Sequence, residues 1–255
     1  MIAGIFYEGS GLGDQLFRYI TVRTFAEEKG FDWGMFSSKN FKGISFLPTP
    51  LEALPSAEFK RWNEKDIRDK DGLDIRSYDP EINFIEDNTI IDGSFEDDKY
   101  WRHNLDNISK WLAVEPLNVP DDKCIMGFRG GEYITNPDLF LPAGYWRDAR
   151  NHMKDKYFEI HTDDPMLARQ LFPTDFVVDN QPISHSKHTN MGLNWRSARY
   201  AKYAIIPNSA FFILPRLLKH FEDPTAVTIA PRYWARHNTK TWARPACYYK
   251  EFRYI

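Results

Sequence analysis

Apolar residues in the first half of the chain form short unbroken runs separated by polar turns and longer periodic segments. The short runs cover residues 2–7, 32–36 and 89–92, and they predict buried strands of a parallel sheet. Residues 15–29 carry apolar side chains at helical spacing and predict a helix that Asp14 caps and Gly30 ends. The pattern over 97–112 predicts a second helix, and charges with two early prolines over 48–80 predict a loop with one short helix.

The second half alternates more regularly between strand-like and helix-like segments. Predicted strands lie at 124–128, 157–161, 175–178, 204–206 and 226–229, and predicted helices at 142–153, 165–171, 193–200 and 210–219. Strict alternation of this kind is typical of a parallel, doubly wound sheet. A seam over 113–123 holds Pro116 and Pro120 and separates the halves. We therefore expect an α/β fold with two Rossmann-like domains that face a cleft, 1–115 and 120–235, followed by a tail over 236–255.

Composition and charge narrow the classes of function. The 255 residues are 42% apolar, enough for a sizeable core, and the net charge of −3 provides no basic excess for duplex nucleic acid or an anionic membrane. Apolar runs are far shorter than the roughly 20 residues of a membrane helix, and no signal peptide opens the chain. These features predict a soluble, cytoplasmic protein in which Cys124 and Cys247 are reduced.

A first glycine-rich turn holds Gly9, Gly11 and Gly13 between the predicted strand 2–7 and the helix that follows. Such a turn lets backbone N–H groups approach a phosphate or a sugar closely. The third glycine comes one residue early for a dinucleotide fingerprint, while Asp32 stands near the place of a ribose-binding acid. An NAD-linked oxidoreductase and a tight turn without a ligand therefore both stay open.

A second glycine turn follows the strand 124–128, at the carboxyl edge where open α/β sheets bind ligands. Arg129 can grip a diphosphate with two parallel hydrogen bonds, and Gly130 and Gly131 let the backbone come near. Glu132 adds a carboxylate suited to a general base. The alternative is a surface Arg–Glu pair of little consequence.

Two further strand ends carry small polar groups. Asp163 and Asp164 follow 157–161, and the simplest expectation is that one binds a base or ribose while the other caps the next helix. Asn208 and Ser209 follow 204–206 and could form a phosphate cradle or a plain helix cap. The convergence of three strand ends on one edge predicts a nucleotide-type ligand.

Read together, these segments resemble the bacterial and viral type of α-1,2-fucosyltransferase (glycosyltransferase family 11) and its inverting relatives of the GT-B fold. The likeness runs in order from about residue 4 to 235. It is carried by GLGDQLFRY at 11–19, DGSFEDDKYW at 92–101, FRGGEY at 128–133, LPAGYW at 141–146, FEIHTDD at 158–164, AIIPNSAF at 204–211 and IAPRYW at 229–234. The chain departs from the family where Gly127 replaces a histidine, Gly130 an arginine and Glu132 an aspartate.

The resemblance implies an inverting glycosyltransferase that moves a sugar, with L-fucose from GDP-fucose the first candidate, to a hydroxyl of a glycan acceptor. It implies that Arg129 holds the donor pyrophosphate and that Glu132, or else Asp14, is the general base. It makes 1–115 the acceptor-side domain and 120–235 the domain that binds the nucleotide sugar. The remaining donor residues implied are Gly131, Asp163, Asp164, Asn208, Ser209 and Phe211, and Gly11, Gly13 and Gln15 would face the cleft from the first domain.

The same resemblance implies a metal-independent reaction with no cofactor besides the GDP-sugar. Asp69 and Asp71 match the Asp-x-Asp spacing of metal-using glycosyltransferases, but no apolar strand precedes them, so a solvated loop is favoured. His185 and His188 likewise lack further zinc ligands nearby. The altered donor motif leaves one alternative open, a non-catalytic relative that binds nucleotide sugars or glycans. The sequence does not indicate an oligomeric state.

Overall fold

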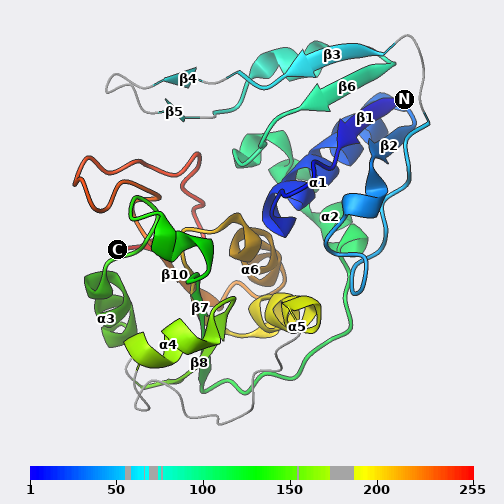
Figure 1. Ribbon diagram of the computed structural model, residues 1–255. Coiled ribbons are helices and arrows are strands. Elements are labelled where there is room, and N and C mark those ends of the chain that lie inside the picture. Colours follow the sequence, from blue (N-terminus) through cyan, green and yellow to red (C-terminus); the bar gives the residue numbers. More distant parts are fainter. Residues whose placement is uncertain (55–58, 66, 69–73, 76, 154, 173–186) are drawn as a thin grey trace. The chain divides into compact units, whose positions relative to one another are not determined.

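The computed structural model describes residues 1–54, 59–65, 67–68, 74–75, 77–153, 155–172 and 187–255 (Figure 1). The chain forms two compact units, unit 1 (Met1–Val114) and unit 2 (Glu115–Ile255). Each unit has its own parallel sheet and its own helices, so each is an α/β body.

The sheet of unit 1 has the order β2-β1-β6-β3, and all its neighbours run parallel. Its strands are β1 (Ile2–Ile5), β2 (Trp33–Phe36), β3 (Lys60–Asn63) and β6 (Thr89–Asp92). Helix α1 (Leu12–Lys29) connects β1 to β2 and packs on both strands. The predictions of strands at 32–36 and 89–92 are confirmed.

Helix α1 begins earlier than its apolar pattern indicates. Gly11 is the N-cap and provides no side-chain bond, so the prediction that Asp14 caps the helix is wrong. Asp14 lies in the first turn, where a negative charge interacts favourably with the positive end of the helix dipole. Gly30 ends the helix as predicted, with a φ of 69° that favours glycine and an N–H that reaches the carbonyls of Ala26 and Glu27.

The remainder of unit 1 is more irregular than the sequence indicates. The stretch over 48–80, predicted as a loop with a short helix, contains β3 and the antiparallel pair β4 (Ile67–Arg68) and β5 (Asp74–Ile75). Two single turns of 3₁₀ helix, η3 (Asp98–Tyr100) and η4 (Arg102–Asn104), precede α2 (Leu105–Trp111), where one helix was predicted. Short 3₁₀ turns also occur at η1 (Ser38–Asn40) and η2 (Pro80–Phe84).

The sheet of unit 2 has the order β11-β10-β9-β7-β8 and is parallel throughout, which confirms the predicted α/β class. Its strands are β7 (Lys123–Phe128), β8 (Tyr157–Thr162), β9 (Tyr203–Ile205), β10 (Val227–Ala230) and β11 (Arg253–Tyr254). Strand β11 comes from the residues expected to form a tail. The predicted strand 175–178 lies outside the described residues.

The helices of unit 2 are α3 (Ala143–Asn151), α4 (Pro165–Leu171), α5 (Lys187–Tyr200) and α6 (Ala210–Glu222), with a 3₁₀ turn η5 (Glu132–Thr135). A core cluster of β7, β8, α3 and α4 includes Phe128, Trp146 and Phe158. Helices α5 and α6 pack against each other. No helix in the described ranges combines the length and apolarity that a membrane span requires.

Arg216 of α6 is fully buried, and oxygen atoms surround its guanidinium. Its Nε donates to Thr228 Oγ1 at 2.9 Å, and its Nη1 donates to the carbonyls of Ala198 and Ala201 at 2.9 and 2.6 Å. Desolvation lowers the pKa of Arg216 to about 9. The side chain thus ties the end of α5 to β10 through α6.

Candidate functional site

The order of the strands places a topological switch point between β7 and β9. From β7 the chain crosses through α3 to β8 on one side, whereas β9, β10 and β11 extend on the other. Ligands of open parallel sheets bind outside the carboxyl ends of the strands at such a point. Two of the sequence-predicted segments lie there, the turn that begins at Arg129 and the Asn208–Ser209 segment. A hydrogen bond of 3.1 Å from the Tyr133 hydroxyl to the Asn208 carbonyl joins them.

Arg129 stands between two carboxylates at this edge. Its Nη2 lies 3.1 Å from Glu132 Oε1 and its Nη1 lies 3.1 Å from Asp163 Oδ2, and the guanidinium carbon is 5.2 Å from the centre of the Tyr133 ring. The two partners differ in exposure, because the Glu132 side chain is 76% exposed and that of Asp163 is 28% exposed. Glu132 is therefore the easier partner for an incoming anion to displace.

Asp163 also holds the glycine turn in place. Its Oδ1 accepts the Gly130 N–H at 2.9 Å, so one carboxylate fixes both the backbone of the turn and the arginine. A Cβ at Gly131 would come 2.7 Å from Asp163 Oδ2, and a Cβ at Gly130 would come 2.8 Å from Asp164 Cβ. The turn therefore has no room at Gly130 for the second arginine of the family motif, whereas a side chain at Gly131 would displace the Asp163 carboxylate.

Asp164 has the structural role that the sequence predicted for one of the two aspartates. Its Oδ1 accepts the Leu167 N–H at 3.0 Å and caps α4, and its own N–H donates to Thr162 Oγ1 at 2.9 Å. A contact with a nucleoside, expected from the resemblance for Asp163 or Asp164, stays a prediction. Asp163 is the better candidate for this contact, because it is more exposed than Asp164 and lies against the glycine turn.

Asn208 connects three loops at the edge of the sheet. Its side chain is buried, and Nδ2 donates to the carbonyl oxygens of Leu139 and Trp234 at 2.8 and 2.6 Å. Ser209 begins α6 without a side-chain cap, so the first turn of this helix presents its N–H groups at the switch point. Phe211 packs edge-on against Trp195 and Phe212, which gives it a place in the packing of α5 and α6.

Two buried polar atoms of this edge have no hydrogen-bond partner among the described residues, Arg129 Nε and Asn208 Oδ1. Buried polar atoms are satisfied in the great majority of cases, and exceptions occur at sites that bind a ligand or water. Their presence on two of the predicted residues is consistent with a binding site at the switch point.

Gly127 occupies the position of the histidine in the family motif, and in this structure a side chain at residue 127 would have no room. A Cβ at Gly127 would lie 2.5 Å from Cζ of Phe212, 2.7 Å from Cε2 and 2.9 Å from Cε1. Real Cβ contacts essentially never approach below 3.0 Å. The Phe212 ring therefore fills the volume that a side chain at residue 127 would need.

The first glycine turn lies at the carboxyl end of β1 in unit 1. Gly11 is exposed and Gly13 is buried in the first turn of α1. Gln15 is buried, with Nε2 donating to the Asn40 carbonyl at 2.8 Å and Oε1 accepting the Lys42 N–H at 2.9 Å. Its side chain therefore fixes the loop after η1 rather than pointing toward solvent.

Asp32 lies at the amino ends of the strands of this sheet, opposite the carboxyl ends where the glycine turn lies. Strands β1 and β2 are parallel, with Ile2 beside Trp33, so Asp32 precedes the amino end of β2. A dinucleotide ribose would require an acid at the carboxyl end of that strand. The structure thus removes the basis for the NAD hypothesis.

Sequence reasoning missed a polar cluster at the carboxyl edge of unit 1, between β1 and β6. The Tyr7 hydroxyl donates to Asp92 Oδ2 at 2.5 Å, and Arg61 Nη2 lies 3.1 and 3.2 Å from the same two groups. The guanidinium of Arg18 covers the Tyr7 ring at 4.9 Å. Burial, with the hydrogen bond to Asp92, raises the pKa of Tyr7. The sequence did contain a signal for this cluster, because Tyr7 and Asp92 are polar residues at the ends of two predicted strands.

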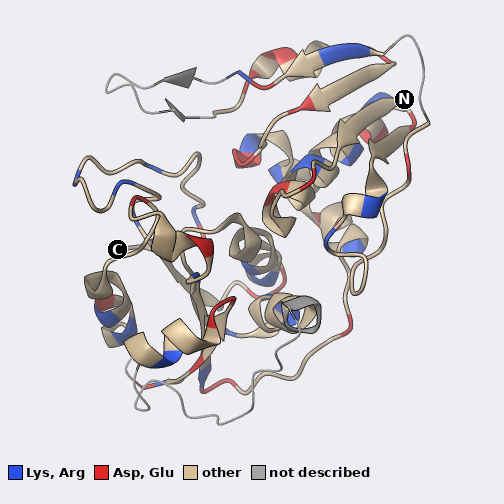
Figure 2. Ribbon diagram, in the orientation of Figure 1, with Lys and Arg blue, Asp and Glu red and all other residues tan. Residues whose placement is uncertain are grey.

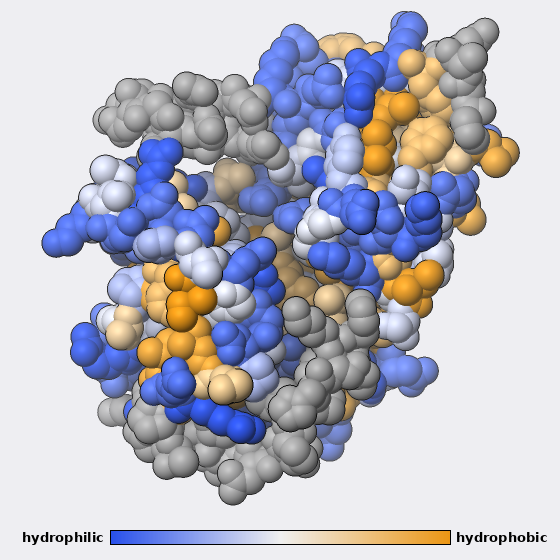
Figure 3. Space-filling model, viewed as in Figure 1, coloured by the Kyte–Doolittle hydropathy of each residue, from blue (hydrophilic) through white to orange (hydrophobic). Residues whose placement is uncertain are grey.

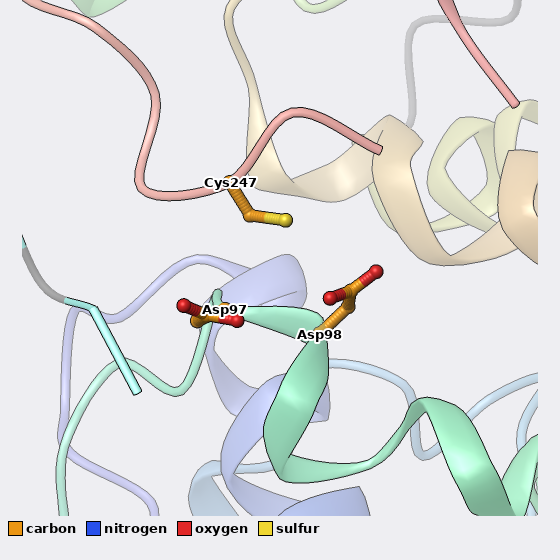
Figure 4. A group of neighbouring side chains, drawn as sticks. All are labelled: Asp97, Asp98 and Cys247. Atoms are coloured by element: carbon orange, nitrogen blue, oxygen red, sulfur yellow. The ribbon is translucent and has the colours of Figure 1, made fainter. Parts of the chain in front are cut away.

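The adjacent aspartates Asp97 and Asp98 belong to the start of η3 in unit 1 (Figure 4). Asp97 accepts the backbone N–H groups of Tyr78 and Lys99, and Asp98 pairs with Arg102. Cys247, drawn in the same figure, is part of unit 2. The two aspartates stabilise the local backbone and pair with Arg102, and we assign them no metal. Asp69, Asp71 and His185 lie outside the described residues, as does the side chain of His188.

No protein-family model matches the chain, and no curated protein matches it. Among solved structures, the chain is similar to NodZ alpha-1,6-fucosyltransferase soaked with GDP-fucose, at 14% identity over 85% of this chain and 92% of that one, with a TM-score of 0.47. A structure of fucosyltransferase NodZ from Bradyrhizobium matches 85% of this chain and 93% of its own at 14% identity and a TM-score of 0.44. Heptosyltransferase WaaC of E. coli with ADP matches 91% of this chain and 87% of its own at 13% identity and 0.42.

Proposed function

We propose that the chain is an inverting glycosyltransferase that transfers a sugar from a nucleotide diphosphate donor to a hydroxyl of a glycan acceptor, with GDP-fucose the first donor to test. The observation that carries the proposal is the position of Arg129, at the switch point of the second sheet, beside a glycine turn and an uncapped helix N-terminus. A guanidinium and backbone N–H groups together are a recurrent solution for binding a diphosphate.

In the proposed complex the donor pyrophosphate replaces Glu132 on Arg129, while Asp163 keeps the other edge of the guanidinium in place. Arg129 and the N-terminus of α6 then stabilise the charge that grows on the leaving diphosphate. This arrangement needs no divalent metal and no cofactor besides the donor. Asn208, Ser209 and Phe211 would form the rest of the cradle around the phosphate and ribose.

The acceptor hydroxyl attacks the anomeric carbon from the face opposite the diphosphate. A carbon–oxygen bond forms to the acceptor as the bond to the phosphate oxygen breaks, and the hydroxyl proton passes to a carboxylate. Glu132 is our first candidate for this base, because displacement from Arg129 leaves its carboxylate without its cation. Asp14, in the first turn of α1, is the second candidate.

A non-catalytic relative that binds nucleotide sugars or glycans is the second candidate function. Gly130 supports it, because the turn has no room for the second arginine of the resembling motif. The two functions differ in turnover: a binding protein retains the nucleotide sugar intact, whereas a transferase also hydrolyses it slowly when no acceptor is present.

The experiment measures thermal stabilisation and released nucleotide with GDP-fucose, GDP-mannose, UDP-sugars and NAD. We expect a response to one GDP-sugar that falls roughly 30- to 150-fold in affinity in Arg129→Ala, as for the loss of ~2–3 kcal/mol of charge-assisted hydrogen bonds. Arg169→Ala is the matched control, because Arg169 is an exposed arginine in the last turn of α4. Stabilisation without released nucleotide favours the binding protein. No response to any nucleotide refutes the transferase and leaves only a relative that binds glycans.

A further inference from the structure

The connection between β10 and β11, residues 231–252, forms a projecting loop that we call the crossover loop (Figure 1). It folds back on itself at an antiparallel bridge between Ala235 and Ala243. The Trp234 N–H donates to the Ala243 carbonyl at 2.7 Å, and the Ala243 N–H donates to the Ala235 carbonyl at 2.9 Å. The function proposed above does not use this loop.

The crossover loop concentrates positive charge in a chain that is acidic overall. The whole chain has a net charge of −3, yet the loop holds five Lys and Arg residues and the single acid Glu251. Figure 2 shows the cations spread along it. They are Arg232, Arg236, Lys240, Arg244 and Lys250.

These five cations are available for a partner. Within the part of the chain that the structure describes, none of the five has a carboxylate at ion-pair distance. Arg232, Lys240 and Arg244 are exposed. A group of unpaired surface cations attracts anions over roughly 10 Å at moderate ionic strength.

Aromatic side chains lie among these cations. Tyr233 and Trp242 stack at 5.3 Å between ring centres with an angle of 18° between the rings, and Trp242 is 43% exposed. Tyr248 is equally exposed, and its hydroxyl donates to the Arg232 carbonyl at 2.7 Å. Such rings offer flat, partly apolar faces with polar edges, which suit the faces of sugar rings.

The composition of the loop argues against two other partners. Residues 231–250 include no Leu, Ile, Val, Met or Phe, so no long aliphatic side chain adds to their aromatic rings for insertion into a bilayer. The loop itself is mostly hydrophilic in Figure 3, and a hydrophobic patch lies directly below it in that view. A long nucleic acid would meet the acidic remainder of the chain, which makes a short anionic segment the better match.

The loop is attached to the donor site within unit 2. Asn208 Nδ2 donates to the Trp234 carbonyl at 2.6 Å, and the His237 N–H donates to the Asp138 carbonyl at 3.3 Å. The base of the loop therefore lies beside Asn208, whose carbonyl accepts the Tyr133 hydroxyl of the turn that begins at Arg129.

We infer that the crossover loop binds an acceptor glycan that carries negative charges, with sugar rings on the Tyr233–Trp242 stack and the anions on Arg236, Lys240 and Arg244. The anions are carboxylates of uronic acids or phosphates, which share the chemistry that arginine recognises. The term acceptor rests on the proposed function, whereas binding of an anionic glycan does not.

The test is calorimetric titration at 20 and 300 mM salt with oligogalacturonate, phosphorylated dextran, neutral dextran of matched length and a short oligo(dT). We expect an anionic glycan to bind at least tenfold more tightly than neutral dextran at low salt, and high salt to weaken it. The double variant Arg236→Gln/Arg244→Gln and the single variant Trp242→Ala should each lose tenfold or more. Arg147→Gln/Arg169→Gln removes the same charge from exposed positions of α3 and α4 and should bind as the parent does.

Equal binding by the loop variants and the parent, or no anionic glycan bound by the parent, overturns the inference. Tighter binding of oligo(dT) than of either glycan overturns it in favour of nucleic acid. The GDP-sugar response of the same variants separates this inference from the proposed function. A normal response to the GDP-sugar with no glycan bound refutes glycan binding by the loop and leaves the proposed transferase intact. Glycan binding without any nucleotide response refutes only the transferase.

Discussion

The contact between Gly127 and Phe212 predicts that an alanine at residue 127 destabilises unit 2. The added Cβ would come 2.5 Å from Cζ of the Phe212 ring, and the ring is itself buried, so one of the two must move. Overpacking of this kind costs ~1–3 kcal/mol of unfolding free energy. For a protein of this length, each kcal/mol lost from the unfolding free energy lowers Tm by roughly 2–4 °C.

The three atoms closest to the added Cβ are the far ring atoms Cζ, Cε1 and Cε2. Leucine lacks those atoms, so Phe212→Leu opens the volume that Gly127→Ala needs. Phe212→Leu alone removes buried surface and should cost about 1 kcal/mol. The double variant should then be at least about 1 kcal/mol more stable than the sum of the two single effects predicts.

The assay is urea unfolding followed by tryptophan fluorescence and circular dichroism for the four proteins of this cycle. Additive effects within about 0.5 kcal/mol, or a Gly127→Ala variant as stable as the parent, would show that the ring does not occupy this volume. Gly4→Ala is a reference for alanine at another tightly packed strand glycine, since its Cβ would come 2.7 Å from Val22 Cγ2. Phe212→Leu should not improve that variant.

Three further outcomes follow from the same structure. Burial and then the nearby Arg216 lower the pKa of His220 from 6.5 to about 4, so the unfolded state binds more protons between these values. As the pH drops from 6.5 to 4, stability in urea titrations should therefore fall by up to ~3 kcal/mol more in the parent than in His220→Gln; equal slopes would contradict this. Asn208→Leu should cost ~2–4 kcal/mol in urea unfolding because two carbonyl oxygens lose their donor, while the exposed Asn151→Leu should change stability by less than about 1 kcal/mol. Release of nucleotide from the responding GDP-sugar should stay within twofold after treatment with EDTA, and a tenfold loss would contradict a metal-independent reaction.

The elements that the sequence predicts well are those whose ends carry a clear local signal. Strand β6 and helix α4 have the predicted bounds, since each apolar stretch is bounded by polar or proline residues. Strand β3 escaped prediction because it is an edge strand that begins with two charged residues, and all of its residues but Trp62 are exposed. Its hydrogen bonds to β6 involve the backbone, which leaves little trace in side-chain chemistry.

The candidate site was predictable in position but only partly in detail. Placing Arg129, Asp163 and Asn208 at one edge follows from parallel strands alone. The sequence offered the Arg129–Glu132 pair as an alternative, and the structure contains that pair. The sequence could not show that Arg129 also pairs with Asp163, because this contact depends on side-chain geometry across two loops. The same holds for Gly127, because the lack of space for a side chain there is caused by the ring of Phe212, which is distant in the sequence.

The crossover loop is joined to the proposed donor site through its own main-chain atoms. The groups that Asn208 and Asp138 engage on the loop are the carbonyl of Trp234 and the N–H of His237, which any residue but proline would offer equally. Substitutions in the loop can thus alter what it recognises while its attachment persists. Insertions near its tip should also be tolerated, because doubling a loop's length costs only about 0.6 kcal/mol. If the loop binds the acceptor as inferred above, changes of acceptor and changes of donor would fall on separate segments of unit 2.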